Sequence, residues 1–402
     1  MIIIGGSYTE ICLEPIWGNI YGSGLRAANL IAEFDNSEEI IFHTCADHEV
    51  IPHLKYYEGM FKNLSLNITE IPKSPEFHYD HPLKVPYIFP RPDVISEKKA
   101  KINCEGDNIL IYGLIESEIV ANGIKVVYDP QSPSNPKPFS KLGGNADQLV
   151  TIINFSEAKR IVGSDNVQEI KKYFLEKEDC YALVLKMGAL GALVFDTSSD
   201  EEIIKIPVYK TQRVWPIGSG DVFSAFFAYQ WFNGNSISDS ATLASKATAV
   251  YCNTKSLTIS NYLEKFDLEK LVVDSIPDRQ IYLAGPFFTF TERWLVNEVW
   301  KIFRGMNLKI FSPFHDVGHG KAEDVVEKDI IGLNESEIIF AILDHLDSGT
   351  LFEVGYAIAK GKKVIAFVQN ESEEALKMLE GTNCIIEKDL TTAIYKTYWE
   401  LC

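Results

Sequence analysis

The sequence predicts an α/β protein with two doubly wound sheets. Each half of the chain is expected to contain one of these mostly parallel sheets. Two observations support this prediction: strand-type apolar runs alternate with helical runs, and the alternation stops and then restarts once. Such alternation is typical of mostly parallel sheets with helices on both faces. At 402 residues the chain is also too long for one ordinary domain, so two domains are expected.

Six apolar runs predict strands of the N-terminal sheet. They are MIII near residue 1, EIIFHT near 39, ILIYG at 109–113, KVVYD at 125–129, YALVLKM at 181–187 and GALVF at 191–195. Two consecutive helices are predicted at 221–233 and 239–252. Segment 72–92 carries six prolines, so we expect a loop, an edge or a lid there, and neither a central strand nor a helix.

A short polar stretch, DSIPDR at 274–279, is the predicted joint between a domain of residues 1–275 and a domain of residues 279–402. The second domain is expected to be a small flavodoxin-like or Rossmann-like sheet. Its predicted strands are IYLAG at 281–285, LKIFS at 308–312, EIIFAIL at 337–343 and KKVIAFV at 362–368. Because ligands of doubly wound sheets bind at the carboxyl ends of the strands, the loops after these runs are the places to search for chemistry.

Composition narrows the class of partner. A net charge of −18 argues against a nucleic-acid partner, although local amides or a metal could still hold small anions. No apolar run has the length of a membrane helix, and the initial MIII is too short for a signal peptide. The seven scattered cysteines form no CxxC pair and suit a reducing compartment. We therefore expect a cytoplasmic protein that binds small molecules and neither nucleic acid nor membrane.

The first candidate site is GSGD at 218–221, directly before an apolar helical run. Two glycines let the backbone approach a ligand, and the first-turn N–H groups of the helix can then hold an anion. Asp221 stands where it could take a proton from a hydroxyl that attacks a bound phosphoryl group. The tetrapeptide is also ordinary at a helix start, with Asp221 as a cap, so it does not decide alone.

Two further motifs favour phosphoryl transfer: NFSE at 154–157, with the spacing NxxE, and the strand–turn–strand KMGALGALVF at 186–195. With them, residues 105–260 resemble the ribokinase (PfkB) family of sugar and nucleoside kinases. The resemblance implies ATP and Mg²⁺ as cofactors, with no side chain assigned as a direct metal ligand. It also implies site roles: an anion hole of Gly218, Ser219 and Gly220, a base at Asp221, magnesium and phosphate organisation by Asn154 and Glu157, and a nucleotide-side loop containing Lys186, Gly188 and Gly191.

The acceptor end matches this family less closely. GSYTE at 6–10 and YGSGLRAAN at 21–29 resemble the family's sugar-binding stretches, with Asn29 at the position of its Asn. Glu10 stands where an Asp is usual, and segment 72–92 does not look like regular lid strands. The resemblance implies that Glu10 and Asn29 face the acceptor. The alternative is a half that has lost kinase activity and serves as a nucleotide-sensing or assembly module.

The second candidate site is DHLDSGTLFEVGYA at 344–357, where the carboxylate of Glu353 stands among apolar helix residues. A nucleophilic carboxylate needs a rigid mount, an apolar wall and a nearby acid, which Asp347 could supply. Alternatively, Asp347 and Ser348 cap the helix and Glu353 makes a surface ion pair. Spacing alone favours this alternative.

Three segments expected at one edge of the sheet favour a catalytic role for Glu353. They are YLAGPFF at 282–288, FSPFHD at 311–316 and DSGTLFEVGYA at 347–357. Residues 279–402 resemble the nucleoside 2-deoxyribosyltransferase family, whose hallmarks are YLAGP and DxGTxxExGYA. The resemblance implies that Glu353 is a nucleophile, Asp347 handles the base or orients the sugar, and Tyr282 positions Glu353. Further substrate contacts are expected, without a cofactor, from Asp329, Gly285, Pro286, Phe287, His315, Ser348 and Gly349.

Together the two resemblances predict a bifunctional enzyme that metabolises nucleosides, nucleotides or sugars. Its C-terminal half would cleave or transfer an N-glycosidic bond, and its N-terminal half would be an ATP-dependent kinase. Because members of the transferase family complete their sites with a neighbouring subunit, a homo-oligomer is expected. The motif HDVGH at 315–319 has a metal-like spacing but no obvious third ligand, so no metal site is predicted there.

Overall fold

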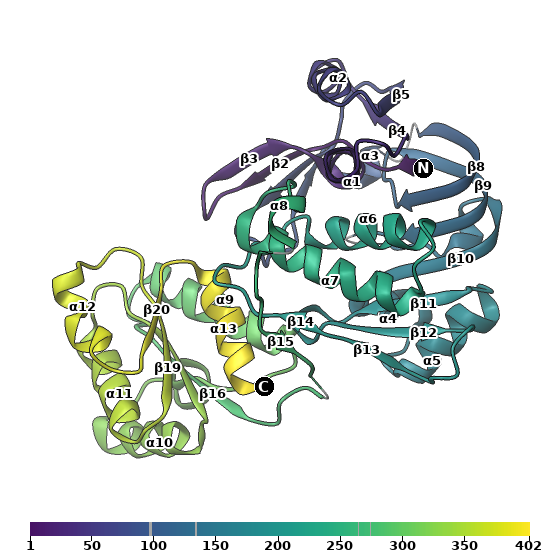
Figure 1. The fold of residues 1–402 in the computed structure, drawn as a ribbon. Coiled ribbons are helices and arrows are strands. Elements are labelled where there is room, and N and C mark those ends of the chain that lie inside the picture. Colours follow the sequence, from purple (N-terminus) through teal and green to yellow (C-terminus); the bar gives the residue numbers. More distant parts are fainter. Residues whose placement is uncertain (96–98, 133–134, 264, 274) are drawn as a thin grey trace. The chain divides into compact units, whose positions relative to one another are not determined.

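A computed structural model describes residues 1–95, 99–132, 135–263, 265–273 and 275–402 of the chain (Figure 1). It contains two compact units. The first unit comprises Met1–Thr211 and Trp215–Val272, and the second comprises Gln212–Val214 and Val273–Cys402. Each unit is built on its own mostly parallel sheet, which confirms the predicted fold class.

The first unit contains a nine-stranded sheet with the order β13-β12-β11-β10-β9-β8-β1-β4-β5. Its strands are parallel from β5 to β11, and β12 and β13 are antiparallel. All six predicted runs lie in this sheet. Its strands are β1 (Ile2–Ile4), β4 (Ile40–Ala46), β5 (Leu64–Glu70), β8 (Ala100–Tyr112), β9 (Ser117–Asp129), β10 (Gly144–Asn154), β11 (Ala182–Lys186), β12 (Ala192–Asp196) and β13 (Ile204–Ile206).

Helices cover both faces of this sheet and enclose two hydrophobic cores. One core contains residues of α1 (Gly22–Phe34), α6 (Ser219–Phe232) and α7 (Ile237–Thr254). The other contains residues of α4 (Phe155–Val162) and α5 (Val167–Lys172). The unit also contains three further α-helices and a two-stranded pair: α2 (Ile51–Met60), α3 (Pro92–Ile95), α8 (Ser260–Leu263), β14 (Val208–Tyr209) and β15 (Lys270–Leu271).

Strands β8 and β9 are parallel neighbours, although only residues 113–116 connect them. Their register runs from Ala100↔Ser117 to Tyr112↔Asp129, and the one missing pair is Asp107 with Ile124. A straight strand of this length would separate its ends by about 40 Å. The short connection can bridge less than about 20 Å. Each strand must therefore fold back on itself close to the missing pair.

This fold-back replaces the helical run expected between ILIYG and KVVYD, so that expectation was wrong. The first halves of the two strands supply Ile102, Ile119 and Ala121 to the same core as Ile109 and Val126 of the second halves. A second β layer thus covers the sheet where a crossover helix was predicted. β10 pairs with β9 through the same gap, between Ala146 and Gln148.

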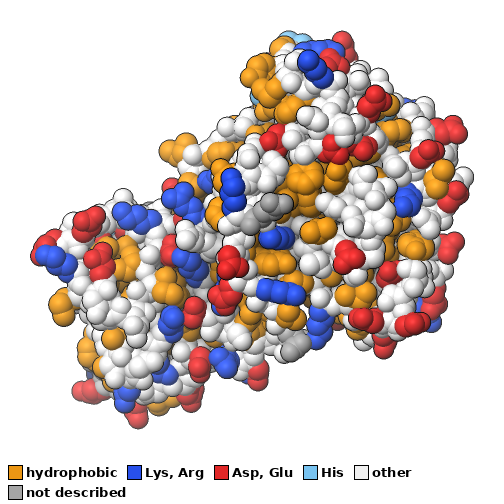
Figure 2. All heavy atoms as spheres, in the orientation of Figure 1, with side chains coloured by type: hydrophobic (Ala, Val, Ile, Leu, Met, Phe, Trp, Pro, Cys, Tyr) orange, Lys and Arg blue, Asp and Glu red, His pale blue; other side chains and the backbone are white. Residues whose placement is uncertain are grey.

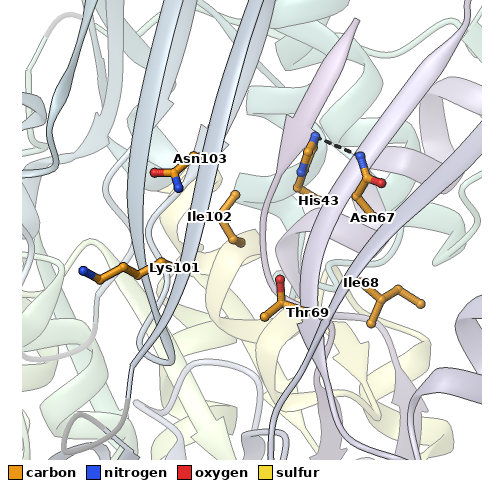
Figure 3. A pocket seen from close by; sticks show the side chains of 7 residues that line it. All are labelled: His43, Asn67, Ile68, Thr69, Lys101, Ile102 and Asn103. Atoms are coloured by element: carbon orange, nitrogen blue, oxygen red, sulfur yellow. Dashed lines mark hydrogen bonds between the residues drawn. The ribbon is translucent and has the colours of Figure 1, made fainter.

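A polar pocket of about 190 Å³ lies between the first half of β8 and strands β4 and β5. Figure 3 shows Lys101, Ile102 and Asn103 on one side of it and residues of β4 and β5, among them His43 and Asn67, on the other. The second half of β8 instead pairs with β1. None of the site residues predicted from sequence lines this pocket.

A separate four-stranded sheet has the order β3-β2-β6-β7. It consists of β2 (Thr9–Cys12), β3 (Trp17–Ile20), β6 (Glu76–Tyr79) and β7 (Tyr87–Phe89). The six prolines of segment 72–92 all lie outside its strands, so the segment can still pair. β7 is an edge strand, as predicted, but β6 is flanked on both sides, so the exclusion of a central strand was wrong for Glu76–Tyr79.

The second unit is a five-stranded parallel sheet with the order β17-β16-β18-β19-β20. The chain places β17 on one side of β16 and β18 on the other, which creates the crevice where doubly wound sheets bind ligands. The four predicted strands are present and β20 adds a fifth. The elements are β16 (Gln280–Ala284), α9 (Phe290–Gly305), β17 (Lys309–Phe311), α10 (Ala322–Glu335), β18 (Ile338–Ile342), α11 (Ser348–Ala359), β19 (Lys363–Phe367), α12 (Glu373–Glu380), β20 (Ile385–Glu387) and α13 (Leu390–Leu401).

In the part of the chain that the structure describes, no helix has the length and apolarity needed to cross a bilayer. On the face shown in Figure 2, acidic and basic side chains are interspersed rather than gathered in one basic patch.

The fold-back can be tested at Gly123. A Cβ at this position would lie 2.8 Å from the Val126 side chain and 3.1 Å from that of Ile109. We expect Gly123→Ala to cost about 1–3 kcal/mol through overpacking and to lower the melting temperature of the first unit by several degrees. The matched control is Gly59→Ala in α2, where no atom lies within 4 Å of the added Cβ. Equal melting temperatures for the two variants in calorimetry would contradict the fold-back.

Candidate active sites

Asp347 and Glu353 are both positioned by the start of α11. Asp347 is the N-cap: its Oδ2 accepts hydrogen bonds from the Thr350 N–H at 2.9 Å and the Thr350 hydroxyl at 3.0 Å. The helix cap proposed as an alternative is therefore present, although it involves Asp347, whereas Ser348 begins the helix. The preceding residues His345 and Leu346 have φ values of 70° and 47°, which turns the chain sharply after β18.

Glu353 makes no ion pair with any residue that the structure describes, in contrast to that alternative. The Tyr282 hydroxyl, at the end of a fully buried side chain on β16, donates to its Oε1 at 2.7 Å. Burial raises the pKa of Glu353 to about 7, the Tyr282 hydrogen bond lowers it, and the charges of Asp329 and Asp347 raise it further. The carboxyl group therefore exchanges its proton near neutral pH while a neutral phenol holds it in place.

Asp329, on α10, is the third acid of this group. Burial raises its pKa, and its Oδ1 is buried without a hydrogen-bond partner among the described residues. Its charge acts on both Tyr282 and Glu353. A buried carboxyl oxygen without a partner is costly unless a ligand satisfies it. Three elements, α10, α11 and β16, thus bring a carboxyl cluster to one end of the sheet.

Aromatic rings gather on the loops beside these acids. The Phe287 ring lies 5.4 Å from Phe288, 5.5 Å from Phe314 and 5.8 Å from His319 between centroids. Phe287 follows Gly285 and Pro286 at the carboxyl end of β16. Gly285 permits a close approach, because a Cβ there would lie 3.1 Å from Ile342. Flat apolar surfaces of this kind suit a nucleobase.

His315 is held by the protein itself. Its ring stacks on Trp300 at 4.5 Å, Nδ1 bonds the Ser312 hydroxyl at 3.0 Å, and Nε2 lies 3.3 Å from the Asn297 side chain. Burial lowers its pKa. A substrate contact from His315 would need one of these bonds to break. Trp300 and Asn297 lie in a helix without a motif, so sequence reasoning had no signal for them.

In the first unit, Arg26 bonds two of the predicted site residues, Asp221 and Glu10. Arg26 itself was not predicted as a site residue. The fully buried Arg26, on α1, donates from Nη1 to Asp221 and from Nη2 to Glu10. The second oxygen of Glu10 accepts the Gly22 N–H at 3.2 Å, and the second oxygen of Asp221 accepts the Gln131 amide. Burial raises the pKa of Glu10, and the Arg26 charge opposes this shift.

The GSGD turn itself is shaped around this arginine. Gly218 has a φ of 78°, and a Cβ on it would lie 2.2 Å from the Arg26 guanidinium carbon, so only glycine fits. Ser219 begins α6, and Gly220 lies close to the ammonium of Lys186. Asn29, one turn after Arg26, is buried, and its amide makes no hydrogen bond of normal geometry to the described residues.

Neighbouring parallel strands end in Asp129, Asn154 and Lys186, which therefore meet at one sheet edge. The Lys186 ammonium bonds Asp129 at 2.7 Å, and the Ser224 hydroxyl donates to the same oxygen at 2.6 Å. The other oxygen of Asp129 is buried without a partner among the described residues. Asp129 was missed, although it ends the predicted strand KVVYD.

The NxxE motif forms a capping box at the start of α4. Asn154 accepts the Glu157 N–H at 2.8 Å, and Glu157 accepts the Asn154 and Ser132 N–H groups. Burial and the charge of Asp129 raise the pKa of Glu157 to about 7. Two buried acids, one with a free oxygen, are a set of donors that a magnesium ion fits. Gly188 and Gly191, with φ values of 61° and 86°, form the turn between β11 and β12.

These folds and sites define a two-part α/β protein with a cluster of buried acids in each part. Two family models match it: pfkB family carbohydrate kinase over residues 112–263, and nucleoside 2-deoxyribosyltransferase over residues 281–389. The two matches are consistent with a fusion of a domain similar to the pfkB family and a domain similar to the nucleoside 2-deoxyribosyltransferase family.

Similar proteins are found for the first part. Ribokinase of Lactococcus lactis subsp. lactis (strain IL1403) is 32% identical over 125 residues, which cover 31% of this chain and 37% of the ribokinase. Fructokinase of Vibrio cholerae O395, solved with fructose, ADP and calcium, is 15% identical with a TM-score of 0.49, over 66% of this chain and 98% of its own. Ribokinase of Thermotoga maritima is 17% identical with a TM-score of 0.46, over 64% of this chain and 94% of its own.

The raised pKa of Glu353 predicts a pH-dependent stability. Its ordinary value is 4.5 and its folded value about 7, so the unfolded chain releases the proton first as the pH rises. The folded state therefore loses stability between these values, and the full cost is present above pH 7. We expect Glu353→Gln to raise the melting temperature more at pH 8 than at pH 5.

The matched control for this experiment is Glu380→Gln, at an exposed position on α12. Scanning calorimetry at both pH values should show a pH-dependent gain for Glu353→Gln alone. The same gain in both variants would mean that Glu353 is not buried in its charged form.

Proposed function

We propose that the C-terminal half cleaves or transfers the N-glycosidic bond of (deoxy)nucleosides or their 5′-monophosphates through Glu353. The single observation that supports this function is the hydrogen bond from the buried Tyr282 hydroxyl to a carboxyl group whose pKa is about 7. This bond orients Glu353 without neutralising it, as a nucleophile requires. The family match over residues 281–389 agrees with it.

In the proposed reaction, Tyr282 holds Oε1 and the ionised Glu353 attacks C1′ with Oε2. The new O–C1′ bond forms as the C1′–N bond breaks through an oxocarbenium-like state, and the electron pair leaves with the base. Asp329, whose pKa burial raises, or Asp347 donates a proton to that base. A second base or water then attacks C1′ and frees Glu353, which gives transfer or hydrolysis respectively.

Removal of the nucleophile should stop this chemistry. We expect Glu353→Ala to lower the rate of base release by about 10³-fold or more, because the variant lacks the carboxylate proposed to form the glycosyl bond. Chromatography of deoxynucleosides and deoxynucleotides incubated with the enzyme measures this rate, and Glu380→Gln is the matched control. Unchanged base release by Glu353→Ala would reject the assignment.

Tyr282→Phe tests the positioning role separately. Because the Tyr282 hydrogen bond lowers the pKa of Glu353, its loss should raise that pKa. The acid limb of the kcat/KM profile should then move to higher pH, while activity partly recovers in alkaline buffer. A lower rate with an unshifted profile would indicate that Tyr282 is only structural.

For the N-terminal half, we propose a nucleotide site at the start of α6. The supporting observations are the GSGD turn, Lys186 next to Gly220, and the unpartnered oxygen of Asp129. Lys186 and the amides of the turn would hold the phosphates of ATP, and Asp129 with Glu157 would hold magnesium. Bound ATP and Mg²⁺ would supply a transferable phosphoryl group. If this half is a kinase, Asp221 would accept the proton of a sugar or nucleoside hydroxyl, and the chain would be bifunctional.

The alternative is a nucleotide-sensing or assembly half that regulates the glycosidic half without phosphotransfer. The ion pair between Arg26 and Asp221 favours it, because the intended base is already bonded. Asp221→Asn distinguishes the two functions when ADP formation with sugars and nucleosides is measured beside calorimetric ATP binding. A kinase loses turnover in this variant, whereas a sensor has no acceptor-dependent turnover to lose and keeps ATP binding.

We also propose that the chain works as a cytoplasmic homo-oligomer. Large apolar side chains remain exposed on the second unit beside the Phe287 cluster, namely Phe288, Phe290 and Trp294. A partner copy would remove this apolar surface from water.

A further inference from the structure

We propose that Arg26 occupies the acceptor position of the N-terminal half, so that this half binds a nucleotide without passing its phosphoryl group to a sugar or nucleoside. The inference rests on the nucleotide site proposed above. Arg26 would block the acceptor end, and this half would then sense a nucleotide and would not act as a kinase.

The guanidinium of Arg26 is enclosed by neighbouring residues of the protein. Its side chain is 1% exposed, and its two terminal nitrogens donate to Glu10 and Asp221. The Tyr21 ring lies 5.1 Å from the guanidinium carbon. On the remaining side Gly218 lies so close that even a methyl group would overlap with Arg26. The group that fills this space therefore belongs to the protein.

Both acids expected to serve an acceptor already accept a hydrogen bond on each of their carboxyl oxygens. Asp221 receives Arg26 on one carboxyl oxygen and Gln131 on the other. Glu10 receives Arg26 and the Gly22 N–H. A general base needs a lone pair directed at the hydroxyl that it deprotonates, and here Arg26 and Gln131 lie against the two oxygens of Asp221. An arginine cannot relay the proton instead, because its guanidinium stays protonated.

Displacement of the Arg26 side chain from this position would cost free energy. Its departure would leave Glu10 and Asp221 as two uncompensated carboxylates in a buried site, which is strongly destabilising. At the nucleotide end, Lys186 and Ser224 bond Asp129 and not the acids of the Arg26 cluster, whereas Gly218 of the GSGD turn packs against Arg26. The observed contacts therefore close the acceptor end while they leave the phosphate end intact.

The first test uses the full-length wild-type protein. We expect calorimetry to show binding of Mg-ATP, and a coupled assay to show no ADP formation above background when ribose, deoxyribose or a nucleoside is added. ADP formation that depends on one of these acceptors and disappears in Asp221→Asn would overturn the proposal. Absence of ATP binding would instead reject the nucleotide site, and the second test still examines Arg26.

The second test asks whether the site is built for a guanidinium. Arg26→Ala should lower the melting temperature of the first unit by several degrees, and guanidinium ion at about 20 mM, far below denaturing concentrations, should restore part of it by binding the folded state. Wild-type protein, which has no vacancy, should show no rescue. Arg26→Lys keeps the charge and provides a folded comparison if Arg26→Ala does not accumulate.

Destabilisation with guanidinium rescue supports an internal occupant. A melting temperature that Arg26→Ala leaves unchanged, or one that guanidinium fails to raise, would overturn the proposal whatever the glycosidic half does. Base release by the same protein samples is measured in parallel, so that failure of the glycosidic function is recognised separately.

Discussion

The free-energy cost of burying a carboxylate shapes both halves of this protein. Each sheet ends in acidic side chains that are shielded from water, and a buried charge must be paired, hydrogen bonded or protonated. The C-terminal half gives Glu353 a neutral phenol, so its proton can still exchange near neutral pH. The N-terminal half gives Asp221 a guanidinium, which forms an ion pair with it. The two acids therefore differ in their partner: Glu353 is bonded by a neutral phenol and Asp221 by a guanidinium.

The fold-back of β8 and β9 is a second constraint on the N-terminal half. A crossover helix would need a longer connection than the chain provides, and a second β layer covers the sheet instead. The second halves of the strands keep the parallel register, so Asp129 still reaches the edge where Asn154 and Lys186 end. The sheet edge with Asp129, Asn154 and Lys186 therefore forms even though no crossover helix joins β8 and β9.

Sequence motifs located much of both candidate sites, because short spacings survive folding. Within one helix start, the distance from Asp347 to Glu353 follows from helix geometry, and NxxE is long enough to close a capping box. The missed residues are those whose roles depend on partners far away in the chain. Arg26 meets Asp221 across 195 positions, and Gln131 meets it across 90.

By itself, the sequence determined the fold class, the strands with strong apolar runs and the loops that carry acids, since periodicity and turn chemistry are local properties. Only the tertiary structure decided what each acid faces. Apolar runs cannot reveal that two strands fold back, because a bent strand keeps the same alternation. Nor can a motif reveal whether its carboxylate meets a phenol or a guanidinium, because those partners arrive from other elements and the low dielectric around them sets the charge.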